Sequence, residues 1–183
     1  MDHTDHVNLL RPASLTPGGT WADFGAGQGA FTLALRELLG PHANIYAVDK
    51  DQRALKDLEH AHRERFATSQ NIHAVRADFS GMLSMPPLDG IVMANSLHYF
   101  KDKEKTLRHV RSVLKLNGVL LLVEYNVDSG NIWVPYPLSF ESYRLVAPRA
   151  GYSEPRLLGT LPSRFLREIY SAAAYRNSTE HPS

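Results

Sequence analysis

The sequence predicts an α/β fold: a doubly wound sheet of seven strands, mostly parallel with an antiparallel last strand, and helices on both faces. Short apolar runs alternate with longer helical patterns along most of the chain, which is typical of βαβ units and a parallel sheet covered on both sides. The last two apolar runs, 154–162 and 165–176, follow each other without a helix between them. Strands joined by a short turn pair antiparallel, so we expect the sheet to end in a hairpin.

The elements can be assigned in chain order. Residues 1–18 are interpreted as an N-terminal arm, because they end in the turn signal TPGG. Buried strands are expected at 20–24, 44–50, 71–78, 88–95 and 118–125, and helices at 29–40, 51–66 and 102–118. Gly40 and Gly118 are expected to stop the first and third of these helices. Residues 139–151 also have a helical pattern, which Pro148 limits.

The composition is that of an ordinary globular protein, and it excludes several kinds of chemistry. The 183 residues are 43% hydrophobic and 21% charged with a net charge of +1, so we expect neither nucleic acid nor a membrane as a partner. The absence of cysteine excludes disulfides, cysteine nucleophiles and zinc-thiolate sites, and no metal is expected. The N-terminus is unlike a signal peptide, and the apolar run 118–125 is too short to cross a bilayer. A cytoplasmic protein is therefore expected.

The stretch ADFGAGQGAF, residues 22–31, carries three glycines between the first strand and the first helix. Such a turn lies at the carboxyl end of the sheet, where Gly25, Gly27 and Gly29 let the backbone approach a ligand closely. The turn matches the relaxed dinucleotide fingerprint. It leaves two cofactor classes open: a nicotinamide or flavin dinucleotide, or S-adenosylmethionine.

Carboxylates at three successive strand ends favour the second class. Asp23 would repel a pyrophosphate, but it suits the cationic methionine end of S-adenosylmethionine. Asp49 can accept hydrogen bonds from both ribose hydroxyls. Asp78 can accept one from the exocyclic amine of adenine, and Phe79 can lie against the ring.

The segments DFGAGQG, YAVDKD, RADF, DGIVMANSLHYF and LKLNGVLLLVEY resemble, in order and spacing, the class I S-adenosylmethionine-dependent methyltransferases, particularly small ones that act on small molecules. The resemblance covers residues 18–125 well and the tail loosely. It implies a Rossmann-like fold, with Asp23 facing the methionine amino group and Asn95 beside the methionine part. The cofactor contacts that it implies are Asp23, Gly25, Ala26, Gly27, Gly29, Asp49, Lys50, Asp78, Phe79 and Asn95.

Residues near the transferred methyl group are expected in the loops after the fourth and fifth strands. In the first loop His98 is the candidate general base, and Tyr99 beside it is a second catalytic candidate. The second loop, 124–139, is long, and we predict that Tyr125, Trp133 and Tyr136 form an aromatic wall for a flat apolar or cationic acceptor. Alternatively, His98 packs against the next helix or caps it, and the aromatic side chains only cover the sheet edge.

We therefore expect one methyltransferase domain over residues 1–183, with an arm (1–18), a cofactor-binding core (19–125), and a substrate loop with the terminal hairpin (126–183). The predicted reaction is in-line transfer of a methyl group from S-adenosylmethionine to a small molecule, with release of S-adenosylhomocysteine. The alternatives are methylation of RNA or protein, an NAD-dependent oxidoreductase, and a non-catalytic binding subunit. Asp49 would alternatively only cap the next helix.

Overall fold

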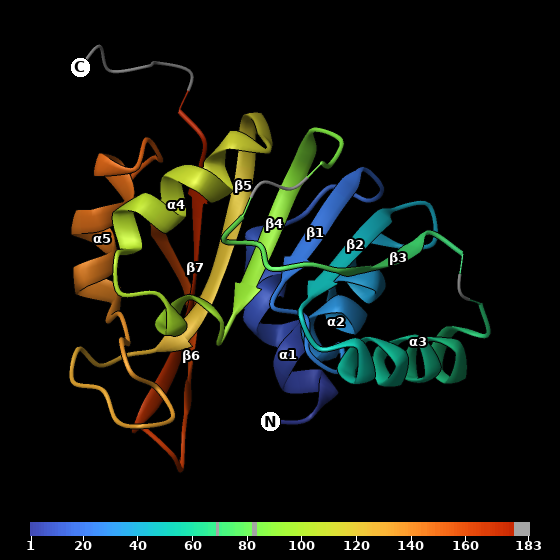
Figure 1. Cartoon of the computed structure of the whole chain (residues 1–183), viewed down its shortest axis with the longest axis horizontal. Helices are drawn as coiled ribbons and strands as arrows, with labels where there is room; N and C mark the ends of the chain where they lie inside the picture. Colours follow the sequence, from blue (N-terminus) through green and yellow to red (C-terminus); the bar gives the residue numbers. More distant parts are fainter. Residues whose placement is uncertain (69, 82–83, 178–183) are drawn as a thin grey trace.

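The sheet has the predicted topology. A computed structural model describes residues 1–68, 70–81 and 84–177, and within them seven strands form one sheet in the order β3-β2-β1-β4-β5-β7-β6 (Figure 1). β7 pairs antiparallel with both neighbours, whereas the other pairs are parallel. The strands are β1 (Thr20–Phe24), β2 (Asn44–Asp49), β3 (Ile72–Arg76), β4 (Leu88–Ala94), β5 (Leu114–Tyr125), β6 (Arg156–Pro162) and β7 (Glu168–Tyr175). The predicted antiparallel hairpin is therefore confirmed.

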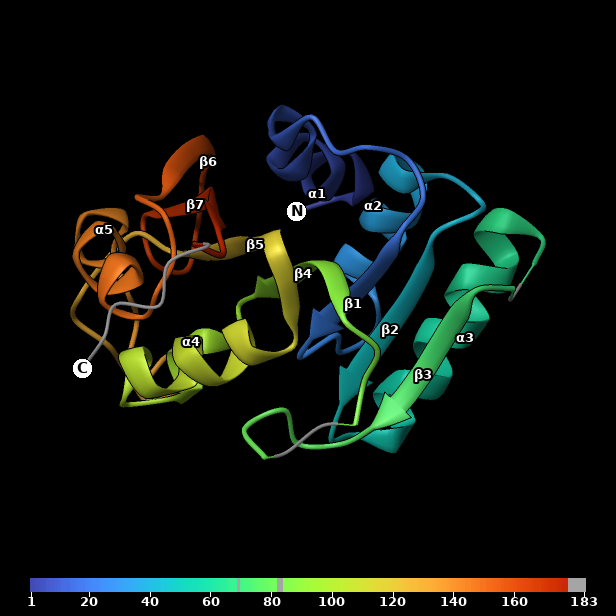
Figure 2. The same ribbon diagram turned by 90° about the horizontal axis from the view of Figure 1, so that it is seen from above.

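Helices cover both faces of the sheet, as predicted. α1 (His3–Leu10) and α2 (Ala30–Leu39) lie on one side, and α4 (Lys103–Ser112) and α5 (Phe140–Arg149) lie on the other (Figure 2). α3 (Gln52–Phe66) packs on β2 and β3. Two short 3-10 helices, η1 (Arg11–Ala13) and η2 (Leu97–Tyr99), complete the elements. Among the helices that the structure describes, none is long and apolar enough to cross a membrane.

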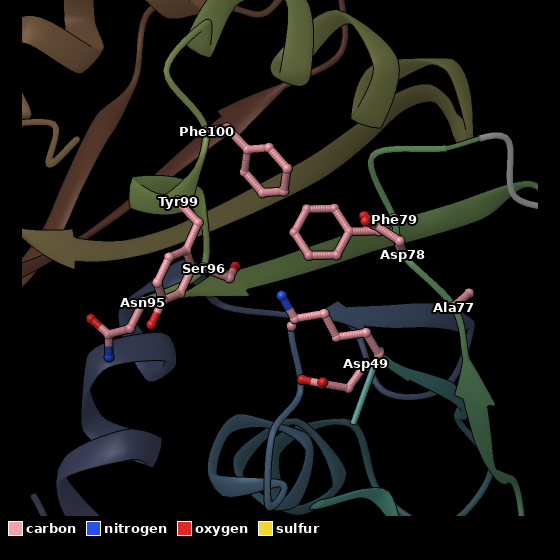
Figure 3. A pocket seen from close by; sticks show the side chains of 10 residues that line it. Asp49, Ala77, Asp78, Phe79, Asn95, Ser96, Tyr99 and Phe100 are labelled. Atoms are coloured by element: carbon pink, nitrogen blue, oxygen red, sulfur yellow. The ribbon is translucent and has the colours of Figure 1, made fainter. Parts of the chain in front are cut away.

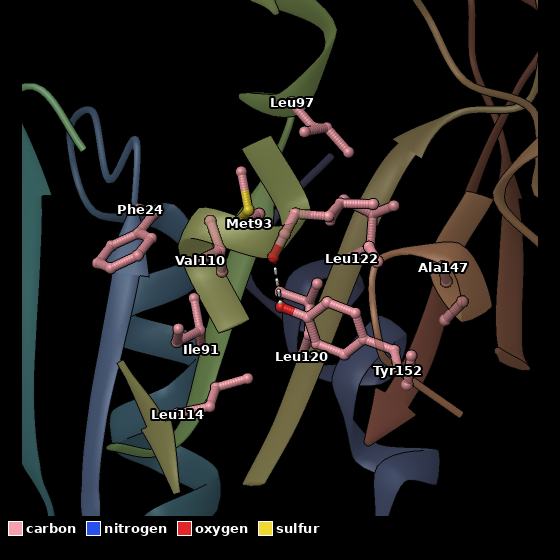
Figure 4. Packing of buried hydrophobic residues seen from close by; sticks show 14 of the residues in the cluster. Phe24, Ile91, Met93, Leu97, Val110, Leu114, Leu120, Leu122, Ala147 and Tyr152 are labelled. Carbon is pink, nitrogen blue, oxygen red and sulfur yellow. Dashed lines mark hydrogen bonds between the residues drawn. The ribbon is translucent and has the colours of Figure 1, made fainter. Parts of the chain in front are cut away.

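Two layers of apolar side chains hold the helices on the sheet. On the α4 and α5 face, Val110 and Ala147 pack with Ile91 and Leu120 of the central strands (Figure 4). Tyr152 is buried in the same layer, and its hydroxyl donates to the carbonyl of Leu107 at 3.1 Å. A buried hydroxyl needs such a partner, so this bond ties the segment after α5 to α4.

The residues predicted to be an N-terminal arm form a packed helix instead. Asp2 begins α1 with a capping box, in which its side chain accepts from the Asp5 N–H at 2.9 Å. Val7, Leu9 and Leu10 are buried against α2 and the sheet. The arm prediction was wrong because TPGG was given more weight than the capping signal D-x-x-D and the spacing of Val7 and Leu10.

Two boundaries near the middle of the chain also differ from the prediction. The helix expected over 102–118 ends at Ser112, and β5 begins at Leu114. Leu107, Val110, Val113 and Leu114 have helical spacing, but Leu114 pairs with Leu88 of β4, so strand pairing outweighs the local pattern. α5 continues one residue beyond Pro148, which has no N–H to donate to the carbonyl of Arg144, and the helix ends at Arg149.

Candidate functional site

A pocket lies at the carboxyl ends of β1, β2 and β4, beside the chain that leaves β3 (Figure 3). Its volume of about 580 Å³ suits a small-molecule ligand. The residues that line it are Gly25, Asp49, Lys50, Ala77, Asp78, Phe79, Asn95, Ser96, Tyr99 and Phe100. Seven residues predicted from the sequence thus come together, and Ala77, Ser96 and Phe100 were missed although each adjoins a predicted residue.

The glycine turn after β1 has a shape that only glycine allows at two positions. Gly25 has φ +82°, and a Cβ there would lie 2.5 Å from the Cβ of Ser96. Gly29 has φ +90°, and a Cβ there would lie 2.5 Å from Leu58 of α3. Gly25 therefore keeps the pocket floor open, whereas Gly29 lets α3 approach. Ala26 was predicted to contact the cofactor, but it is buried among Ala47, Leu58 and their neighbours and does not line the pocket.

Asp49 joins the glycine turn to the start of α3 and also lines the pocket. Its Oδ2 accepts from the Gly27 N–H at 2.8 Å, and its Oδ1 accepts from the Asp51 N–H at 2.9 Å. The N-cap of α3 is Asp51, which accepts from Arg53 and Ala54. The alternative that Asp49 caps this helix is therefore wrong. A carboxylate oxygen accepts more than one hydrogen bond, so Asp49 can also bind ligand hydroxyls.

Asp78 and Phe79 form the side of the pocket beyond β3. The Ser80 hydroxyl and N–H both donate to Oδ1 of Asp78, at 2.7 and 2.9 Å. The bond from the hydroxyl is the main cause of a pKa for Asp78 below its usual value. Phe79 is 7% exposed and stacks on Phe24 at 5.3 Å between ring centroids. Phe79 therefore belongs to the core and to the pocket wall at once.

Asn95 carries an unpaired buried acceptor at the pocket. Its backbone has φ 51°, and its N–H donates to the carbonyl of Val123 at 2.9 Å. Its Oδ1 is buried and has no hydrogen-bond partner among the residues that the structure describes. Such an atom costs free energy unless a ligand satisfies it. The carboxylates of Asp49 and Asp78 in the same pocket can accept hydrogen bonds from the hydroxyls and the amine of S-adenosylmethionine, so the residues present fit this cofactor.

Asp23 does not face the pocket as predicted. Its side chain is 1% exposed, and its Oδ2 accepts from the hydroxyl of Thr32 on α2 at 2.7 Å. Burial is the main reason that the pKa of Asp23 rises to about 7, against which the bond from Thr32 works. The carboxyl group connects β1 to α2 through this hydrogen bond, and it is therefore held inside the protein and does not line the pocket.

Replacement of Asp23 by asparagine is expected to stabilise the protein increasingly as the pH rises. The folded-state pKa of about 7 lies above the ordinary value of 3.8, so stability falls as the pH rises through this range. The variant has no such charge. Its unfolding free energy relative to wild type should therefore grow by about 1–3 kcal/mol between pH values near 4 and near 8, measured by urea unfolding.

The matched control is Asp78→Asn, because the hydrogen bonds from Ser80 lower the pKa of Asp78. A lowered pKa stabilises the folded state above the ordinary pKa. The control should therefore lose stability relative to wild type as the pH rises towards the ordinary value of 3.8, and the difference should change little between pH values near 4 and near 8. An unfolding free-energy difference for Asp23→Asn that does not change with pH would contradict the assignment.

A buried histidine–glutamate pair lies behind the pocket. His98 of η2 is 3% exposed, and its Nδ1 lies 2.9 Å from Oε2 of Glu124, which is fully buried at the end of β5. The N–H of His98 also donates to Glu124, at 3.1 Å. A carboxylate that accepts from Nδ1–H leaves Nε2 as a proton acceptor. The sequence analysis missed Glu124, although a lone acid at the end of an apolar strand is a usable signal.

Comparison with known proteins gives the family. Residues 22–120, which are more than half of the chain, match the model of a family described as a methyltransferase domain. The chain belongs to this methyltransferase family. Its cofactor is therefore S-adenosylmethionine, which agrees with the resemblance found in the sequence.

Individual relatives of the methyltransferase match only part of its chain or have low sequence identity to it. The chain is 31% identical over 122 residues to the polyketide synthase PksM of Bacillus subtilis and 36% identical over 61 residues to a probable cobalt-precorrin-6B C(15)-methyltransferase (decarboxylating) of Thermoplasma volcanium. These matches cover 62% and 33% of this chain, but only 3% and 30% of the two curated relatives. A crystal structure of magnesium protoporphyrin IX methyltransferase from Synechocystis PCC 6803 with bound S-adenosylmethionine has the same fold. Its TM-score is 0.74 at 18% identity, over 96% of this chain and 78% of that one.

The aromatic wall predicted for the loop after β5 is assembled only in part. The ring of Tyr125 lies 6.1 Å from the ring of His98, between centroids. Trp133 is 71% exposed and is not among the residues that line the described pocket. Tyr136 is 43% exposed. The loop buries its aliphatic members Val134 and Leu138 instead, because these face the protein while Trp133 faces solvent.

Lys103 connects the two loops of the methyltransferase in which acceptor contacts were predicted. Its ammonium donates to the carbonyls of Leu97 and Phe100, at 2.9 and 2.6 Å, and to the carbonyl of Tyr136. Burial lowers the pKa of Lys103 to about 8, and the charge of Glu124 opposes this shift. The sequence analysis missed Lys103, because DKEK is typical of a solvated helix start.

Replacement of Lys103 by methionine is expected to loosen both loops. Three carbonyls lose their donor, which should lower the unfolding free energy by about 1–3 kcal/mol. Hydrogen exchange should accelerate for residues 95–100 and 134–139 more than for the sheet. Lys105→Met, an exposed position on the same helix, is the control. Unchanged exchange in both loops of the Lys103 variant would show that these bonds do not restrain them.

Proposed function

We propose that the protein transfers a methyl group from S-adenosylmethionine to a small molecule whose reacting atom starts protonated. One observation carries the proposal: a buried His98, oriented by a buried Glu124, adjoins a pocket built from the ends of four strands. A base is needed only when the nucleophile carries a proton. An oriented imidazole at this place therefore supports such an acceptor.

Different residues of the pocket would contact different parts of the cofactor. Asn95 would accept from the methionine amino group, and Asp49 would accept from the ribose hydroxyls. Asp78 and Phe79 would hold the adenine, with Gly25 beneath the sugar and Lys50 at the rim. When bound, S-adenosylmethionine supplies an electrophilic methyl carbon on a sulfonium, and the sulfur leaves as the neutral thioether of S-adenosylhomocysteine.

His98 would remove the proton of the acceptor. Its Nδ1–H donates to Glu124, so Nε2 carries the free lone pair. The carboxylate of Glu124 would then stabilise the imidazolium that forms. The same carboxylate accepts from the backbone N–H groups of His98 and Tyr125, which hold it in place without neutralising it.

The low net charge of the chain favours a small acceptor over RNA. A net charge of +1 provides little attraction for a polyanion. Membership of the methyltransferase family excludes the alternative of an NAD-dependent oxidoreductase. The experiment below tests the alternative of a non-catalytic binding subunit. We also propose that the chain forms a single domain. Residues 1–18 are then a packed helical segment of this domain and not an arm.

Methyl-labelled S-adenosylmethionine provides the test. The protein is incubated with dialysable, RNA and protein fractions of a cell extract, and label in each fraction is counted. We expect label in the dialysable fraction and binding of S-adenosylhomocysteine by calorimetry. Label in RNA or protein alone would overturn the small-molecule proposal. Cofactor binding with no label in any fraction would support the non-catalytic alternative.

A further inference from the structure

A continuous row of aromatic rings leads from the pocket to the tip of the terminal hairpin. Tyr99 lines the pocket, and its ring lies 4.3 Å from the ring of His98, between centroids. The ring of Tyr125 lies 6.1 Å from His98, and Phe165 lies 5.8 Å from Tyr125. The row therefore combines η2, the end of β5 and the β6–β7 connection, which are far apart in the sequence.

Hydrogen bonds place Phe165 beside the end of β5. The hydroxyl of Ser163 accepts a hydrogen bond from the Phe165 N–H at 3.2 Å. The Ser163 N–H donates to the carbonyl of Arg167 at 2.7 Å. At the turn end of the hairpin, Asn126 donates to the side chain of Glu168 at 2.7 Å and to its carbonyl at 2.9 Å. The turn between β6 and β7 lies at the lower edge of the view in Figure 1, below the end of β5. Phe165 is thus held by a structured turn.

The exposed fraction of the side chains differs strongly between members of the row. His98 is 3% exposed, whereas Tyr99 is 61% and Phe165 is 49% exposed. Tyr125 is half-buried between them. Exposed aromatic side chains that are contiguous, in contrast to isolated ones, mark binding sites. Their continuity with His98 and the pocket favours the methyl acceptor as the occupant.

The ring geometry indicates the chemical class of that acceptor. Neighbouring rings in the row are tilted relative to one another by 50°, 49° and 58°, so a planar ligand that stacks on one ring meets the next at an angle. Aromatic ligands pack against such surfaces in edge-to-face and offset-stacked arrangements, which saturated rings cannot match. An acceptor with a hydroxyl on an aromatic ring would place its acidic proton near His98 while its ring lies on Tyr125 and Phe165.

We propose that Tyr99, Tyr125 and Phe165 form the acceptor site and that the acceptor is a phenol. This inference rests on the proposed function. Nε2 of His98 takes the phenolic proton, and an oxygen lone pair forms the bond to the methyl carbon. The electrons of the broken carbon–sulfur bond stay on sulfur, so an aryl methyl ether and S-adenosylhomocysteine are the products.

The test compares two probes of similar shape, 2-naphthol and decahydro-2-naphthol, by calorimetry with and without S-adenosylhomocysteine. The saturated probe is the more apolar one, so tighter binding of 2-naphthol reports on its aromatic ring together with its more acidic hydroxyl, and the Phe165 variant separates the two. We expect 2-naphthol to bind about tenfold more tightly. Phe165→Leu should weaken 2-naphthol about fivefold and leave decahydro-2-naphthol unchanged. Leu145→Ala, an exposed apolar position on α5, is the control and should change neither.

Equal affinities for the two probes, or an unchanged affinity of the Phe165 variant for 2-naphthol, would overturn the inference. Stronger binding of tetramethylammonium than of 2-naphthol would overturn it too, because it would indicate a site for cations. Binding of 2-naphthol with no transfer of methyl to its oxygen would leave the aromatic site in place and contradict the reaction assigned to His98. Failure to bind S-adenosylhomocysteine would contradict the cofactor site alone, because titrations without it still decide the aromatic site.

Discussion

Replacement of His98 by asparagine is expected to slow methyl transfer by about 10²–10⁴-fold, the usual contribution of a positioned general base. The asparagine amide can occupy the place of Nδ1 and still donate to Glu124, whereas nothing replaces Nε2. Binding of S-adenosylhomocysteine should change little, because His98 does not line the pocket. The rate is measured by transfer of labelled methyl to the acceptor found in the screen described above. Added imidazole should restore part of it.

His62→Asn is the matched control. His62 is also a buried histidine, but it lies on α3, and its Nδ1 is 2.7 Å from the carbonyl of Thr68. If both variants lose activity equally, the loss reflects folding and not proton transfer. An undiminished rate for His98→Asn would mean that the acceptor reaches the site already deprotonated. Glu124→Gln, which keeps the shape of the side chain but loses its charge, should slow the reaction without weakening cofactor binding.

Replacement of Asp49 by alanine is expected to weaken binding of S-adenosylhomocysteine by about 2–4 kcal/mol, because two hydrogen bonds to a charged acceptor are lost. That is about 30- to 1000-fold in the dissociation constant, which calorimetry measures directly. Part of the effect has a second origin. Asp49 also accepts from the Gly27 N–H, so its removal frees the turn beneath the ligand.

Asp51→Ala separates these contributions. Asp51 caps α3 through Arg53 and Ala54 and does not line the pocket. Its removal should lower the unfolding free energy by about 1 kcal/mol and leave the affinity for S-adenosylhomocysteine nearly intact. Equal losses of affinity in the two variants would show that Asp49 acts only through the start of the helix. A folded Asp49 variant with normal affinity would remove Asp49 from the cofactor site.

Much of the cofactor half of the site follows from local sequence. Gly25, Asp49 and Asp78 each stand at or just after the end of an apolar run, and carboxyl ends of parallel strands meet at one edge of the sheet. Their convergence therefore needs only the strand assignments and the parallel topology. Asp23 is the exception. Its environment depends on Thr32, which reaches it from the following helix, and no periodicity predicts that contact.

The acceptor half was less predictable because its residues are brought together by pairing between strands and loops. His98 and Glu124 are 26 positions apart and meet because β4 and β5 pair in register up to Ala94 and Val123. Lys103 joins η2 to Tyr136 across 33 positions. A charged or polar residue in such a place has the same local pattern as a solvated one, so burial and partners appear only in the folded chain.

The sequence by itself determined the α/β fold, the terminal hairpin, the glycine turn and the acids that surround the cofactor pocket. These depend on short-range patterns: side-chain periodicity, glycine at positive φ, and polar residues at strand ends. Only the tertiary structure decided that residues 3–10 are a packed helix, that Asp23 is buried, that Glu124 holds His98, and that Phe165 stands beside Tyr125. Each of these depends on which side chains pack against one another across the fold, and packing is a property of the whole chain.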